Sequence, residues 1–205
     1  MLASMATAIA APCPDFVQLW FATASERAVG HFATVRANIE YICQVLQLPA
    51  TVEEITTASC IRLDYTRRAL TPRPAAVETL SLLKDANYKI GLVSDCSEDV
   101  PVLLHETPFS RLVHMPIFSN RVGMKKPDQR IYLLVCERLG VEPQACVYIG
   151  DGGSRELTGA AQVGMHPVLI RGRLEESADT MPVDAREWLG PCISSLEEVL
   201  ALIRG

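Results

Sequence analysis

Apolar and small residues recur at helical spacing through the first third of the chain. They lie three or four positions apart, as the inner face of a packed helix requires, at Phe16, Leu19, Trp20 and Thr23, at Val35, Ile39, Ile42 and Leu46, and at Ile55, Ile61 and Leu63. Thr51, with Glu54 three residues later, matches the capping box that begins many helices. The pattern in residues 14–70 therefore predicts three or four packed helices.

After residues 71–74 the pattern changes to short apolar runs that alternate with helical segments. The runs predict strands at 89–94, 115–119, 146–150 and 167–170, and the other segments predict helices at 74–86, 100–104, 128–139, 155–163 and 195–203. Strands separated by helices indicate a parallel sheet. The expected fold class is α/β, with a Rossmann-like parallel-sheet core at residues 73–205 preceded by a helical domain at residues 1–72.

Charge and composition narrow the expected partners and location. Lys and Arg total 19 against 24 for Asp and Glu, and no basic run is present, which argues against nucleic acid and anionic membranes as partners. No apolar stretch is long enough to span a bilayer, and the first residues lack the positive start of a signal peptide. The seven cysteines include no C-x-x-C pair, which favours free thiols in a reducing cytoplasm.

Polar residues follow the predicted strands, where open α/β sheets bind ligands. Ser94 and Asp95 end the first run, where a hydroxyl and free backbone N–H groups can hold a phosphate or simply form a turn. Lys126 precedes Pro127 at a helix start, from which its ammonium can reach a phosphate oxygen. The alternative for Lys126 is a solvated lysine in a loop beside Lys125.

Two acidic residues follow the third predicted strand. Asp151 comes directly after it and Glu156 lies on the next helix, a pattern that suits Mg²⁺ because this ion prefers oxygen ligands. A dinucleotide-binding turn at Gly150, Gly152 and Gly153 is the competing interpretation. It fails because such a turn follows the first strand of a sheet.

The segments GLVSDCS, GMKKPDQRIY and YIGDGGSRELTGA, in this order, resemble the second, third and fourth motifs of the haloacid dehalogenase (HAD) superfamily. The resemblance covers the chain from about residue 14 to its end. It implies that Ser94, with Asp95, binds the transferring phosphoryl group and that Lys126 stabilises its charge. It also implies that Asp151 and Glu156 hold Mg²⁺.

The family's first motif, an apolar strand followed by Asp-x-Asp-x-Thr, is not found in this sequence. Its first Asp is the nucleophile and its second the acid/base, but Asp15, Asp64 and Asp95 all lack the pattern. Residues 1–72 then resemble the family's helical cap, truncated at its N-terminus, and the first core strand is missing. In the family that strand lies between the strands that end at Ser94 and Gly150.

Three outcomes are open for the missing strand. The two strands beside it close on each other, the segment 2–11 fills the slot, or the sequence is a truncated record of a longer protein. We favour the third outcome as the explanation of the sequence.

The resemblance implies a Mg²⁺-dependent phosphohydrolase of a small phosphorylated metabolite, acting through an aspartyl-phosphate. As written, the chain is expected to be inactive because the nucleophile is absent. One alternative is a catalytically dead HAD-like protein that binds a ligand or a partner. Another is a 2-haloacid dehalogenase, which needs no metal; Gly150 and Asp151 favour the phosphatase, because similar dehalogenase sequences lack this Gly-Asp start.

Overall fold

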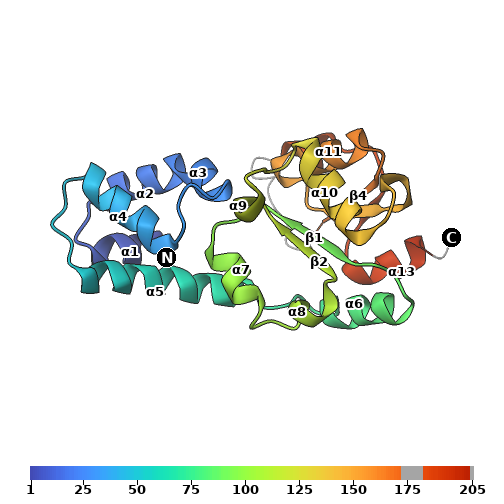
Figure 1. Ribbon diagram of the computed structural model, residues 1–205, viewed down its shortest axis with the longest axis horizontal. Coiled ribbons are helices and arrows are strands. Elements are labelled where there is room, and N and C mark those ends of the chain that lie inside the picture. Colours follow the sequence, from blue (N-terminus) through green and yellow to red (C-terminus); the bar gives the residue numbers. More distant parts are fainter. Residues whose placement is uncertain (172–181, 204–205) are drawn as a thin grey trace. The chain divides into compact units, whose positions relative to one another are not determined.

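The computed structural model describes residues 1–171 and 182–203, which form two compact units (Figure 1). The first unit consists of Met1–Thr71, Asp95–Ser110 and Phe118–Gly123, and the second of Pro72–Ser94, Arg111–Ile117 and Met124–Gly205. A single boundary at residue 72 does not anticipate the two short segments that join the first unit. The assignment of these units to a cap and a core stays a prediction.

The first unit is helical. Its helices are α1 (Leu2–Ala8), α2 (Cys13–Ala22), α3 (Ala24–Ala28), α4 (Val35–Val45), α5 (Val52–Ala69), α7 (Asp99–Leu104) and α9 (Ser119–Val122). The apolar positions at helical spacing form its core, with Phe16, Ile39 and Ile42 fully buried. The helices expected in residues 14–70 are therefore confirmed. No helix in the described part of the chain has the length and apolar character needed to cross a membrane.

The N-terminal segment is a helix and not a strand. Met5 and Ala6 of α1, and Ile9 directly after this helix, are almost completely buried in the helical core. α1 packs against α2 and α5 within the same unit (Figure 1). The possibility that residues 2–11 fill the missing strand is therefore wrong for this structure, because their small apolar side chains fit a helical core.

The second unit is an α/β structure. Its strands and helices are α6 (Ala76–Asp85), β1 (Gly91–Ser94), β2 (Met115–Phe118, its last residue in the first unit), α10 (Gln129–Leu139), β3 (Val147–Gly150), α11 (Glu156–Gln162), β4 (His166–Ile170), α12 (Val183–Glu187), β5 (Cys192–Ile193) and α13 (Val199–Leu202). Three short 3₁₀ helices, Pro143–Ala145, Gly153–Arg155 and Leu196–Glu198, and the helix α8 (Phe109–Leu112) complete the described chain. The α/β fold class is confirmed.

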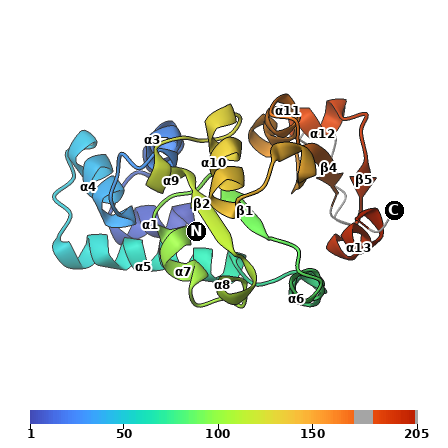
Figure 2. The ribbon, with the colours of Figure 1, turned by 45° about the vertical axis from the view of Figure 1, so that its right-hand side comes forward.

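The strands of the second unit form two separate sheets. β3, β4 and β5 pair in parallel, with Val147 opposite His166 and Leu169 opposite Cys192, while β1 pairs with β2 (Figure 2). Among the described residues, β1 and β3 do not hydrogen-bond to each other. The outcome in which these two strands close on each other is therefore wrong for this structure.

Helices cover the strands closely where the sequence has small residues. α10 packs against β1, and a Cβ atom added at Gly91 would lie 2.8 Å from Cγ2 of Val135. α11 packs against β3 and β4 in the same way. α10 and α11 also pack against each other. Their first residues, and those just before them, are therefore held by neighbouring helices.

Candidate active site

The carboxylate of Glu156 is the centre of a buried hydrogen-bond network at the start of α11. Its Oε2 accepts hydrogen bonds from Nζ of Lys126 at 2.6 Å and from the hydroxyl of Tyr148 at 2.9 Å. Its Oε1 accepts from the backbone N–H of Gly152 at 3.2 Å. Glu156 is only 4% exposed, so its charge depends on these donors in place of water.

The alternation of side chains along β3 explains this arrangement. Tyr148 and Gly150 are two residues apart on one strand, so they face the same side of the sheet. Gly150 has no side chain, and a Cβ atom there would collide with the Glu156 carboxylate. The space left by Gly150 therefore holds the carboxylate, and the hydroxyl of Tyr148 reaches it from the neighbouring position on the same face.

A second tyrosine supports the first. The hydroxyl of Tyr132, on α10, donates to the backbone carbonyl of Glu156 at 3.1 Å, and its ring packs edge-on against Tyr148 with the centroids 5.4 Å apart. Sequence reasoning missed both tyrosines. The signal that could have found Tyr148 is its position two residues before the glycine that ends a strand, with an acidic residue directly after that strand.

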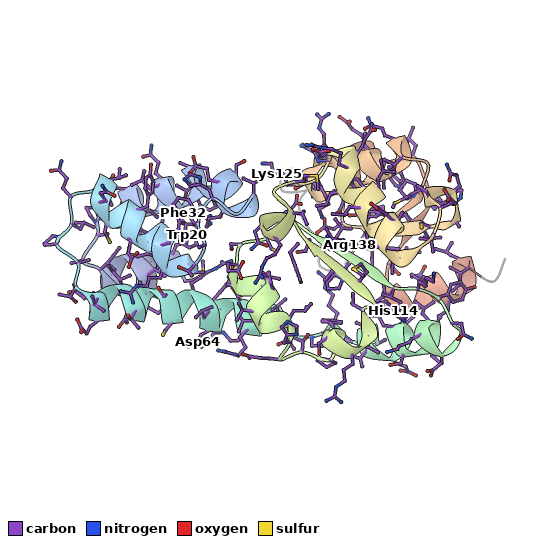
Figure 3. The ribbon with its side chains drawn as sticks, viewed as in Figure 1. Trp20, Phe32, Asp64, His114, Lys125 and Arg138 are labelled. Atoms are coloured by element: carbon purple, nitrogen blue, oxygen red, sulfur yellow. The ribbon has the colours of Figure 1, made fainter. Side chains whose placement is uncertain are left out.

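Lys126 lies just before α10, and its side chain is only 12% exposed. Its ammonium has three N–H donors, and Glu156 takes one of them. Lys125, which Figure 3 labels, is exposed. The buried position beside a carboxylate supports the choice of Lys126 over Lys125 as the lysine of the site.

Ser94 and Asp95 lie at the end of β1. Ser94 is the last residue of that strand and is half-buried, and Asp95 begins the segment that belongs to the first unit. Ser94 thus stands on the two-stranded sheet, whereas Glu156 packs beside the three-stranded sheet. Whether Ser94 meets Lys126 and Asp151 at one edge stays a prediction.

The described residues do not by themselves make a magnesium site. Asp151 follows β3 and is exposed, and its Oδ1 accepts from the backbone N–H of Gly153 at 2.9 Å. Glu156, expected as a second ligand, is instead engaged by Lys126, Tyr148 and Gly152. Residues 1–171 and 182–203 contain no group of three or more His, Cys, Asp or Glu side chains placed to bind a metal ion. Magnesium therefore remains an expectation from the resemblance.

Comparisons with known proteins agree with the fold. Glyceraldehyde 3-phosphate phosphatase of Methanopyrus kandleri is 32% identical over 103 residues, which cover 50% of this chain and 44% of that protein. (S)-2-haloacid dehalogenase 4A of Burkholderia cepacia is 30% identical over 110 residues, covering 53% of this chain and 47% of that protein. The chain thus matches less than half of the length of either relative.

A solved structure and a family match extend over more of the chain. The crystal structure of a HAD phosphatase from Thermococcus onnurineus superposes with a TM-score of 0.66 at 23% identity, covering 100% of this chain and 86% of that one. At this identity the likeness shows the fold alone. Residues 6–164 match the family described as haloacid dehalogenase-like hydrolase. Since that match covers well over half of the sequence, the chain belongs to the haloacid dehalogenase-like hydrolase family.

Proposed function

We propose that this chain carries the phosphate-binding residues of a magnesium-dependent phosphohydrolase that acts on small phosphate esters through an aspartyl-phosphate. The observation that carries the proposal is the buried pair of Lys126 and Glu156, with their nearest atoms 2.6 Å apart. A lysine held in this way offers a fixed positive charge to a phosphoryl group. The similarity to a glyceraldehyde 3-phosphate phosphatase supports a small phosphorylated metabolite as the substrate.

Each residue has a distinct role in this proposal. The hydroxyl of Ser94 donates a hydrogen bond to an oxygen of the phosphoryl group, with Asp95 beside it. The ammonium of Lys126, which Glu156 holds in place, offers its positive charge to a second phosphoryl oxygen. Glu156 and Tyr148 act as positioning residues, since they hold the ammonium in place. Asp151 is the exposed carboxylate that would hold magnesium.

The attacking group is not among these residues. Phosphoryl transfer of this kind needs a carboxylate that attacks phosphorus and an acid that protonates the leaving oxygen. No aspartate in the 205-residue sequence is followed by x-Asp-x-Thr. We therefore propose that a strand with this motif, supplied from outside these residues, lies between β1 and β3, which the structure leaves unpaired with each other.

The experiment compares phosphate release from an aryl phosphate, with Mg²⁺, by four proteins. These are the 205-residue chain, the chain preceded by an apolar strand with Asp-x-Asp-x-Thr, and the extended chain with either the first Asp of the motif changed to Asn or with Lys126→Met. Only the extended chain should turn over, since the other three lack the nucleophile or the charge that stabilises the transition state. Equal rates for the short and extended chains would show that the nucleophile lies elsewhere.

Two alternative functions predict different results in this experiment. A dead HAD-like protein that binds a ligand or partner is favoured by the lack of Asp-x-Asp-x-Thr in the sequence, and predicts no turnover by any of the four proteins. A 2-haloacid dehalogenase is favoured by the similarity to the Burkholderia cepacia enzyme. It predicts halide release from a small 2-haloacid by the extended chain, without added metal.

A further inference from the structure

Arg27, at the end of α3 in the helical unit, is a buried cation whose hydrogen-bond acceptors are all uncharged. It is 8% exposed. Its Nη1 donates to the carbonyl of Trp20 at 2.7 Å, to Oγ1 of Thr23 at 2.7 Å and to Oδ1 of Asn38 at 2.8 Å. Lysine and arginine are almost never buried without an anionic partner, because desolvation of the charge is costly. The local structure thus leaves the charge of Arg27 without a contacting carboxylate among the described residues.

Asp99, a carboxylate whose charge acts on Arg27, is engaged by other donors. Asp99 accepts from Nε of Arg62 at 2.8 Å and from the hydroxyl of Thr66 at 2.5 Å through Oδ2, and from the hydroxyl of Ser97 at 2.6 Å through Oδ1. The charges of Arg27, Arg62 and Asp99 therefore sum to one positive charge. Burial, and next the charge of Arg62, lower the pKa of Arg27 to about 10, while Asp99 raises it. Arg27 is still protonated at neutral pH, so these three groups together carry a net positive charge.

The geometry of the Arg27 guanidinium shows which of its nitrogen atoms have no acceptor among the described residues and remain for a ligand. Trp20 covers one face of it, with Cζ of Arg27 4.1 Å from the ring centroid, and Arg62 lies over the same ring at 5.8 Å. Figure 3 labels Trp20 among the helices of the first unit. Nε and Nη2 of Arg27 make none of its three hydrogen bonds to protein. In the described part of the chain no fully buried side-chain nitrogen or oxygen lacks a partner, so these two atoms are not fully buried.

We propose that Arg27 is the centre of a binding site for a small carboxylate in the helical unit. Nε and Nη2 lie on one edge of the guanidinium and present two parallel N–H groups, which match the two oxygens of a carboxylate. A single negative charge neutralises the net positive charge of Arg27, Arg62 and Asp99. A phosphate dianion would leave an excess negative charge in a buried place, which is costly. The proposal does not depend on the phosphohydrolase function.

The carboxylate can be a free small acid or the acid group of a phosphorylated substrate. The test uses acetate, phosphoglycolate, inorganic phosphate and chloride at one ionic strength, and follows the Nε–H NMR signal of Arg27 in the full 205-residue chain. The signal should move and saturate with acetate, or with phosphoglycolate alone if the carboxylate arrives on a substrate. At about pH 8, chloride and inorganic phosphate should bind at least about tenfold more weakly, because chloride has no two-oxygen edge and phosphate is then mainly a dianion.

Variants of Arg27 separate the effect of its paired N–H donors from the effect of its charge. Arg27→Lys keeps the charge but loses the paired donors, and should weaken carboxylate binding about tenfold or more. Arg68→Lys, at an exposed arginine at the end of α5, is the matched control and should bind as the original chain does. If Arg27→Lys does not fold, the Nε–H signal of the original chain decides alone. The proposal is overturned if neither carboxylate moves that signal, if inorganic phosphate binds as tightly, or if folded Arg27→Lys binds unchanged.

Discussion

The ammonium of Lys126 lies 2.6 Å from Oε2 of Glu156, although the two residues are 30 positions apart in the sequence. Their side chains are 12% and 6% exposed. A pair this buried costs free energy to desolvate and becomes strongly destabilising when one partner is removed, because the other charge stays buried and uncompensated. Lys126 and Glu156 therefore constrain the stability of the second unit and, in the function proposed above, the position of the charge offered to a phosphoryl group.

Removing both charges together should destabilise the protein by less than the sum of the two single removals. We expect Glu156→Gln and Lys126→Met each to lower the free energy of unfolding by about 3–5 kcal/mol. The double variant Lys126→Met with Glu156→Gln should lose clearly less than the sum of the single losses, because no unpaired charge remains. Urea unfolding measures all three. Lys125→Met, at the neighbouring exposed lysine, should change stability by less than about 0.5 kcal/mol. Additive single losses would show that the pair contributes no coupling.

The carboxylate of Asp99 should make the free energy of unfolding depend on pH in the acid range. Burial raises the pKa of Asp99, but hydrogen bonds from Ser97 and Thr66 and the charge of Arg62 outweigh it and leave the pKa below its ordinary value. Its contribution to stability is therefore full above the unfolded-state pKa of about 4 and is lost as pH falls through the lower folded-state value.

The measurement is the free energy of unfolding in urea, from about pH 7 downwards, for the original chain and Asp99→Asn. The variant should be less stable near neutral pH, and the difference should shrink below about pH 4 as the original carboxylate takes up a proton. Asp64→Asn, at an exposed partner of Arg67, is the control and should follow the original chain closely. A difference that stays constant through the acid range would contradict the lowered pKa.

Gly152 should tolerate a side chain less well than Gly123, although both have positive φ. Gly152 has φ +85, and an added Cβ atom would lie 2.7 Å from the backbone nitrogen of Ala185. Gly123 has φ +68 and no atom within 4 Å of an added Cβ atom. Gly123→Ala should cost about 1 kcal/mol from the backbone alone, and Gly152→Ala about 1–3 kcal/mol more from overpacking. Thermal or urea unfolding of the two variants decides this, and equal losses would exclude the contact with Ala185.

Cys136 should react slowly with thiol reagents. Burial, and next the nearby Cys146, raise the pKa of the Cys136 thiol to about 12, and the two sulfur atoms lie 3.8 Å apart. The thiolate is the nucleophile, so at about pH 8 iodoacetamide should label the exposed Cys13 and Cys60 well before Cys136. Mass spectrometry of peptides gives the rates, with urea-unfolded protein as the control in which all cysteines react alike. Comparable rates in the folded protein would contradict the raised pKa.

Several local features were predictable from the sequence because they depend on residues close together in the chain. Thr51 and Glu54 form the expected capping box at the start of α5, and Gly140 ends α10 with positive φ. Helix periodicity predicted α2, α4 and α10, since three or four residues per turn decide which side chains are buried. The order of the strands' end residues was sufficient to show the resemblance to the HAD family.

The N-terminal helix and the last strand were not predicted. Met5 and Ile9 have helical spacing, but a segment of small apolar residues has no capping signal, and only packing against α2 and α5 shows its state. β5 has two residues, Cys192 and Ile193, and exists because it pairs with β4. So short an element carries too little periodicity to be recognised in the sequence.

The sequence by itself determined which residues carry charge or a hydroxyl after a strand or at the start of a helix: Ser94, Lys126, Asp151 and Glu156. Only the tertiary structure decided the partners of Glu156. The sequence suggested a metal ligand, since a carboxylate suits magnesium wherever it stands near another one. In the folded chain, Gly150 leaves room for the Glu156 carboxylate, and α10 brings Lys126 against it. The physical reason is that a buried charge is stabilised by the donors within hydrogen-bond distance, and residues 30 positions apart meet only when the chain folds.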